Sequence, residues 1–221
     1  LSTNVSFLGR NIKKIMLTSS HASEGKSFTS ITLCRKLAER GKRVVLVDTD
    51  LRRSMITTVY GVQFAPGSKK QGLSHYLAGI AEKEEVLFHT NVPGMDFIPM
   101  GHELLNPIPL LSSERFQNLL DGLAEQYDYV IVDAAPVGVV IDAAEIAKVC
   151  DGILLVVSYN QVHRQELIDA KNQLEQTGCP ILGTILNQVD YEGFANKKYY
   201  YKSHYSSYYK AYEKEAEEKK S

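Results

Sequence analysis

The chain has 221 residues, the size of one large α/β domain or at most two small domains. With 44% hydrophobic and 23% charged residues, the composition excludes a disordered protein. The formal net charge of −1 excludes nucleic-acid recognition through the charge of the protein as a whole. No apolar run approaches the roughly 18 residues of a membrane span, and the first residues lack the basic-then-apolar pattern of a signal peptide.

Apolar runs alternate with amphipathic helical patterns, which predicts βαβ units with right-handed crossovers. Strands are expected at residues 15–17, 44–47, 95–99, 129–132, 153–158 and 181–186. Helices are expected at 26–40, 72–88 (one or two), 112–126 and 163–177, with surface loops at 61–72 and 101–109. The predicted fold is a P-loop NTPase-like, mostly parallel sheet with helices on both faces. Ligands of such sheets bind beyond the carboxyl ends of the strands.

The apolar periodicity stops at Tyr191, so we expect a folded domain at residues 1–190 and a flexible tail at 191–221. Residues 196–221 contain seven Lys, four Glu and seven Tyr, but no Val, Ile or Leu, and therefore cannot bury a core. The chain has 13 tyrosines in all, and more than half lie in this segment, which packing does not explain. These tail tyrosines are Tyr199, Tyr200, Tyr201, Tyr205, Tyr208, Tyr209 and Tyr212.

Residues 20–27 (SHASEGKS) follow a predicted strand and open a predicted helix, as a phosphate-binding loop does. Ser20 replaces the first glycine of that motif. Backbone N–H groups of such a loop surround the β-phosphate, Lys26 bridges the β- and γ-phosphates, and the Ser27 hydroxyl joins the Mg²⁺ shell. We expect nucleotide contacts from Ser23, Glu24, Gly25, Lys26, Ser27 and Phe28, with ATP and Mg²⁺ as the bound species.

Three carboxylates lie just past predicted buried strands: Asp48, Asp50 and Asp133. An acid at the end of an apolar strand beside a P-loop is a Walker B arrangement, which assigns Asp133 to Mg²⁺. We expect the side chains of Asp48 and Asp50 on opposite sides of an extended segment, so that one can take a proton from a hydroxyl while the other attends the metal. The alternative is that both only support the metal shell. The following Arg52 contacts phosphate or remains a solvated loop residue.

Together these motifs and the tyrosine-rich tail resemble the bacterial tyrosine kinases (BY-kinases) of capsule and exopolysaccharide synthesis, in particular the cytoplasmic kinase subunit of Gram-positive type. The resemblance covers nearly the whole chain and includes the Asp-x-Asp-x-Arg motif that starts at Asp48. The segments GLSHYLAG (72–79) and NPIPLLSS (106–113) also look like family segments. One departure is Ala134-Ala135-Pro136, where many members have Thr-Pro-Pro.

The resemblance implies ATP-dependent phosphorylation of tail tyrosines in a neighbouring subunit of a homo-oligomer. It makes Lys26 a phosphate ligand and Asp48 the base for the tyrosine hydroxyl, while Asp50, Asp133 and Ser27 attend Mg²⁺. It also implies a membrane-spanning modulator that activates the kinase, a cognate tyrosine phosphatase, and a cytoplasmic location at the inner face of the membrane.

Two other nucleotide-binding classes compete with this interpretation. A partitioning or septum-placement ATPase would use ATP as a dimerisation switch, but its signature lysine is replaced here by His21. A GTPase is suggested by residues 187–190 (NQVD), which lack the central lysine of a guanine-binding motif. Asn187 either contacts adenine or forms an ordinary turn at the end of a strand. The tail has seven Lys against four Glu, so only weak contact with nucleic acid is conceivable, and we expect no nucleic-acid partner.

Overall fold

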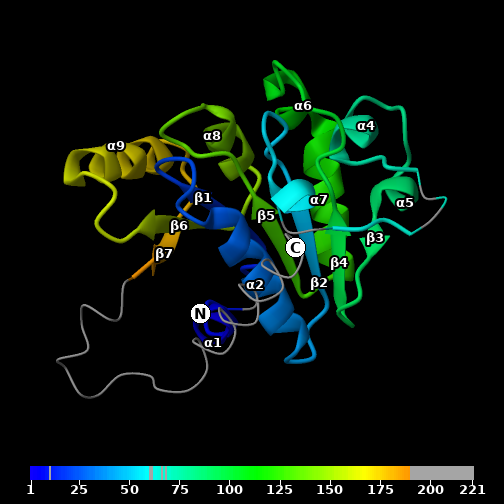
Figure 1. Ribbon diagram of the computed structural model, residues 1–221, viewed down its shortest axis with the longest axis horizontal. Coiled ribbons are helices and arrows are strands. Elements are labelled where there is room, and N and C mark those ends of the chain that lie inside the picture. Colours follow the sequence, from blue (N-terminus) through cyan, green and yellow to red (C-terminus); the bar gives the residue numbers. More distant parts are fainter. Residues whose placement is uncertain (10, 60–61, 66, 68, 190–221) are drawn as a thin grey trace, which may run out of the picture. The chain divides into compact units, whose positions relative to one another are not determined.

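The structure is a computed structural model that describes residues 1–9, 11–59, 62–65, 67 and 69–189. A seven-stranded sheet has the order β3-β4-β2-β5-β1-β6-β7, and only the β3–β4 pair is antiparallel. Its strands, seen side by side in Figure 1, are β1 (Lys14–Ser19), β2 (Val44–Asp48), β3 (Phe88–His89), β4 (Met95–Ile98), β5 (Tyr129–Asp133), β6 (Gly152–Ser158) and β7 (Ile181–Asn187). The described helices are α1 (Ser2–Ser6), α2 (Lys26–Ala38), α3 (Ile56–Val59), α4 (Leu73–Leu77), α5 (Lys83–Val86), α6 (Ile108–Leu111), α7 (Glu114–Gln126), α8 (Asp142–Ala147) and α9 (Arg164–Glu175).

Two apolar cores lie on the two faces of this sheet. Successive strand residues face opposite sides, so Met16 packs in one core with Phe116 of α7, whereas Ile15 packs in the other with Leu33 of α2. Every residue of β2, β5 and β6 is buried, which explains why these strands read as continuous apolar runs in the sequence. The expected parallel sheet with helices on both faces is confirmed.

The structure also contains short elements that the periodicity did not predict. The two-residue strand β3 pairs antiparallel with β4 and closes the edge of the sheet. The six-residue helix α8 follows β5 and is too short to display a clear helical period. The loop expected at 101–109 ends earlier in the structure, because α6 begins at Ile108. The N-cap of this helix is Pro107, and a further proline lies in its first turn, where proline is favoured.

Contacts divide the chain into two units, Leu1–Gln188 and Val189–Ser221, and the elements above belong to the first. The domain boundary expected at residue 190 stays a prediction. Residues 190–221, with all seven tail tyrosines, lie outside the described residues. Among the helices that are described, none has the length and apolar character needed to cross a membrane.

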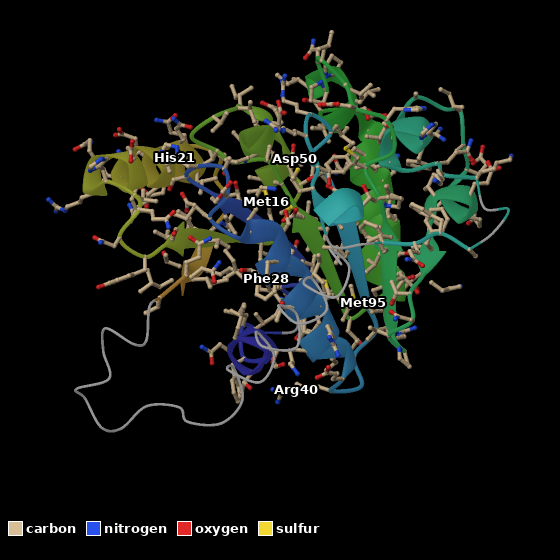
Figure 2. All side chains as sticks on the ribbon, in the orientation of Figure 1. Met16, His21, Phe28, Arg40, Asp50 and Met95 are labelled. Atoms are coloured by element: carbon tan, nitrogen blue, oxygen red, sulfur yellow. The ribbon has the colours of Figure 1, made fainter. Side chains whose placement is uncertain are left out.

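The parallel strands bring their last residues to one edge of the sheet, which we call the carboxyl edge. These residues are Ser19, Asp48, Ile98, Asp133, Ser158 and Asn187, at the ends of β1, β2, β4, β5, β6 and β7. In Figure 2, Asp50 and His21 lie toward this edge, while Met95, at the start of β4, and Arg40 lie toward the opposite, amino edge. The predicted site residues outside the tail therefore gather from distant parts of the sequence.

Candidate active site at the carboxyl edge

The loop between β1 and α2 has the geometry of a phosphate-binding loop. Gly25 caps α2 with φ of 85°, and Ser23 also has a positive φ, 66°. A Cβ atom on Gly25 would lie 2.1 Å from Nδ2 of Asn187, so only glycine fits at this position. The strand-to-helix turn predicted from the sequence is therefore present, with backbone N–H groups at the start of α2 available to an anion.

Residues at the end of β7 support this loop. Nδ2 of Asn187 donates to the backbone oxygen of Glu24 at 2.9 Å, and Nε2 of Gln188 donates to the backbone oxygen of Ser23 at 2.9 Å. The predicted nucleotide residues Ser23, Glu24, Gly25 and Asn187 thus lie together. In this structure Asn187 braces the loop, a role that neither sequence interpretation of this residue included.

Glu24 turns its side chain into the loop rather than toward a ligand. It is 3% exposed, and its Oε1 accepts the backbone N–H of His21 at 2.8 Å. Burial raises the pKa of Glu24 above its ordinary value. Its Oε2 has no hydrogen-bond partner among the described residues. The side chain of Glu24 therefore shapes the loop, and its backbone oxygen accepts from Asn187.

Lys26 lies among carboxylates where α2 begins. Its Nζ is 3.2 Å from Oδ2 of Asp50 and 3.4 Å from Oδ2 of Asp133. Burial alone would lower the pKa of Lys26, but the charges of Asp133, Asp50 and Asp48 outweigh it and raise the pKa. The lysine is therefore held charged at the position where the sequence predicts the phosphates of a nucleotide.

Asp133 is fully buried and connects β5 to the first turn of α2. Oγ of Ser27 donates to its Oδ2 at 2.7 Å, and Oγ of Ser30 donates to its Oδ1 at 2.8 Å. The structure thus joins the predicted pair Ser27 and Asp133. Ser30 was missed, although its position four residues after Lys26 places both on one face of α2.

Asp48 and Asp50 occupy different environments, but not because they lie on opposite sides of a strand, since residues two apart share one face. Asp48 is the last residue of β2, and Asp50 lies in the segment beyond it. Asp48 lies opposite Asp133 in the β2–β5 pairing, is fully buried, and accepts a hydrogen bond from Oγ of Ser54. Burial and the charge of Asp133 raise the pKa of Asp48 to about 8. Asp50 instead contacts Lys26 and accepts the backbone N–H of Arg53 at 3.1 Å.

The donor set fits a nucleotide that carries Mg²⁺. Ser27, Asp50 and Asp133 offer hard oxygen atoms, which Mg²⁺ prefers, and Lys26 offers a cation to the phosphates. No group of three or more His, Cys, Asp or Glu side chains within the described residues forms a metal cage on its own. This agrees with a metal that takes its remaining ligands from phosphate and water.

Three other residues singled out in the sequence take definite positions. Phe28 lies on α2 with 36% of its surface exposed. Nε2 of His21 lies 3.3 Å from a carboxylate oxygen of Glu166. Arg52 pairs with Asp142 at the start of α8, and its side chain is 32% exposed.

Comparison with known proteins places the chain among nucleotide-binding kinases. A family model described as an AAA domain matches residues 12–178. Tyrosine-protein kinase CpsD of Streptococcus agalactiae serotype III (strain NEM316) is 38% identical over 190 residues, which cover 86% of this chain and 80% of that protein. The kinase domain of the Escherichia coli tyrosine kinase ETK superposes with a TM-score of 0.78 at 32% identity, covering 92% of this chain and 75% of that one.

A likeness to a different class of protein is weaker. The septum site-determining protein MinD of Pyrococcus horikoshii OT3, complexed with Mg-ADP, has a TM-score of 0.64 at 22% identity, covering 79% of this chain and 70% of that one. At this identity the likeness shows a shared fold alone.

Proposed function

Since the chain belongs to the bacterial tyrosine-protein kinases, we propose that it transfers the γ-phosphoryl group of ATP to tail tyrosines of a neighbouring copy. The observation that carries this proposal is the cluster of Lys26, Asp48, Asp50 and Asp133 beside the phosphate-binding loop. Residues 199–212 contain seven tyrosines, which would supply the acceptors for a second active site.

In the proposed reaction, the phenolic oxygen of a tyrosine forms a bond to the γ-phosphorus, the bond from that phosphorus to the β–γ bridging oxygen breaks, and ADP leaves. Asp48, in its ionised form, would accept the phenolic proton. Lys26 binds the phosphates in place of its present carboxylate partners. Ser27, Asp50 and Asp133 would hold Mg²⁺, which neutralises phosphate charge when bound.

The charge of the tail indicates how phosphorylation would regulate the protein. Residues 196–221 carry seven Lys and four Glu, a formal charge of +3. Each phosphate adds about −1.5 to −2 charges, so two or three phosphates reverse the sign of the tail. We propose that repulsion between the phosphorylated tail and the acidic site of the neighbouring copy then releases the tail from that site. A cognate phosphatase would restore the unphosphorylated tail.

The wider setting is proposed on family membership. The kinase would be activated by a membrane-spanning modulator, lie at the inner face of the membrane, and regulate capsular or exopolysaccharide synthesis. The alternative, an ATPase that switches by dimerisation, has weaker support, because the septum-placement relative shares only 22% identity and the tyrosine cluster is unexplained by that function.

Mass spectrometry of the full chain after incubation with Mg·ATP tests the proposal. We expect phosphate on tail tyrosines in the unaltered protein and none in Lys26→Met. Lys36→Met is a matched control, because Lys36 lies on the same helix but pairs with exposed Glu39. Equal phosphorylation of Lys26→Met and the unaltered protein would refute the kinase.

A further inference from the structure

A two-pronged ion pair joins the segment after β2 to the start of α8. Nε of Arg52 donates to Oδ2 of Asp142 at 2.6 Å, and Nη2 donates to Oδ1 of the same carboxylate at 3.0 Å. The third nitrogen, Nη1, donates to the backbone oxygen of Leu105 at 2.8 Å. One guanidinium therefore links three segments that are far apart in the sequence.

The ion pair lies close in the sequence to the carboxylates of the candidate active site. Arg52 follows Asp50 by two residues, and Leu51 between them is fully buried. On one side the segment is fixed by Thr49, whose N–H and Oγ1 both donate to the backbone oxygen of Asp133, at 3.0 and 2.8 Å. On the other side the backbone oxygen of Leu51 accepts the N–H of Leu104, and Oγ of Ser54 donates to Asp48. The Arg52–Asp142 pair adds a charged contact between this segment and the start of α8.

Stability alone is a weak reason for such a pair. The side chain of Asp142 is 1% exposed and that of Arg52 is 32% exposed. Burying a carboxylate carries a desolvation cost that an ion pair often fails to recover, and apolar residues of similar volume frequently serve as well. What a forked arginine adds is a fixed geometry, because two parallel N–H···O bonds define both distance and direction.

We propose that Asp142 is a positioning residue for phosphoryl transfer. Through Arg52 it holds residues 50–52 in place and so aims the Asp50 carboxylate at Lys26. The inference rests on the proposed kinase function and adds a residue that does not itself touch the nucleotide. Three of the five guanidinium N–H donors are engaged by Asp142 and Leu105, so we assign Arg52 to holding the backbone that precedes it.

The positioning role predicts a selective kinetic defect. Asp142→Asn keeps the shape and one acceptor oxygen but removes the charge, so residues 50–52 gain freedom while the phosphate-binding loop is untouched. We expect kcat for tail phosphorylation to fall about tenfold or more, the scale expected when a reacting group is misplaced. The KM for ATP and the affinity for a fluorescent ATP analogue should change less than about twofold, as for an interaction made only in the transition state.

Asp121→Asn is the matched control. It removes another close ion pair, Lys14 Nζ to Asp121 Oδ1 at 2.6 Å, which involves the first residue of β1 at the amino edge. This variant should keep the kcat of the unaltered protein. Arg52→Lys provides a second test that retains the charge and loses the fork, and its kcat should also fall with nucleotide affinity unchanged. If Asp142→Asn fails to unfold cooperatively, Arg52→Lys decides alone.

An unchanged kcat in folded Asp142→Asn or Arg52→Lys would overturn the proposal. So would a rise in KM with kcat unchanged, which would make Arg52 a nucleotide-binding residue instead. If the unaltered chain transfers no phosphate, the proposed function fails, and the positioning role is judged by amide hydrogen exchange. Asp142→Asn must then speed exchange at residues 50–53 relative to Asp121→Asn, and equal exchange rates would overturn it.

Discussion

The two edges of the sheet use carboxylates in opposite ways. At the carboxyl edge, Asp48 and Asp133 are fully buried and lie opposite each other in the β2–β5 pairing. At the amino edge, Asp151 remains partly exposed, and its Oδ2 accepts the backbone N–H groups of Lys13 and Lys14, both at 2.8 Å. Asp128 accepts the N–H of Arg43 there in the same way, at 2.8 Å.

This difference separates charge that serves the fold from charge that serves a reaction. Exposed carboxylates that satisfy strand ends cost little and tie the chain together. Two buried carboxylates facing each other oppose folding, and the raised pKa of Asp48, about 8, reflects that cost. A sheet gains no stability from such a pair, so its presence marks the carboxyl edge as the functional one.

Changing Asp133 to Asn should produce the largest contrast between activity and stability. Ser27 and Ser30 lose their charged acceptor and Lys26 loses one counter-charge, so we expect tail phosphorylation to fall about 100- to 1000-fold, as when other electrostatic catalytic groups are removed. The midpoint of thermal unfolding should stay level or rise, because Asn relieves repulsion with Asp48. Initial rates measure the activity and calorimetry measures the stability. A large loss of stability would contradict the claim that the carboxylates of the carboxyl edge do not stabilise the fold.

Changing Asp151 to Ala should give the reverse pattern. Two backbone N–H groups at the start of β1 lose their acceptor, which we expect to lower the free energy of unfolding by about 2 kcal/mol. Urea denaturation measures this loss, and the rate of tail phosphorylation should remain that of the unaltered protein at temperatures where the variant is folded. A variant with normal stability but impaired transfer would contradict the structural role of this edge.

Asn187→Ala tests the brace of the phosphate-binding loop on a smaller scale. The loop loses the bond to the backbone oxygen of Glu24, and we expect affinity for a fluorescent ATP analogue to fall about tenfold, equivalent to about 1.4 kcal/mol. Gln188→Ala is the control, since its bond to Ser23 is exposed and should matter less. Equal losses of affinity in both variants would contradict the role of Asn187 as the main support of this loop.

The smallest effect is expected from Glu24→Gln, and it depends on pH. A carboxyl whose pKa is raised by burial costs nothing when protonated in both states, and its cost grows as pH rises through the folded-state pKa. The variant should therefore unfold at a higher temperature than the unaltered protein at pH 8, with the difference vanishing near pH 4. Thermal unfolding across this range measures it, and a constant difference would contradict the assignment.

Much of the site was predictable because each motif sits at the end of a parallel strand. The sequence places Lys26 after one apolar run, Asp50 after a second and Asp133 after a third, and parallel pairing then brings them to one edge. The separate environments of Asp48 and Asp50 do not follow from alternation, because residues two apart share one face of an extended segment. They arise because the chain leaves β2 after Asp48.

The remaining contacts depend on the strand order, which periodicity does not reveal. Asp142 pairs with Arg52 across 90 residues, and Asn187 reaches Glu24 across 163. Both contacts arise because β2, β5, β1, β6 and β7 are neighbours in that order. Ser54, which donates to Asp48, had no signal in the sequence at all.

A mixing experiment tests the central claim, that one chain's carboxyl edge phosphorylates another chain's tail. One full-length variant carries Lys26→Met with its tail intact, and the other has the seven tail tyrosines changed to Phe with its active site intact. We predict that neither is phosphorylated alone with Mg·ATP, and that mixing them places phosphate on the tail of the Lys26→Met chain. An unmodified tail in the mixture, measured by mass spectrometry, would contradict the account.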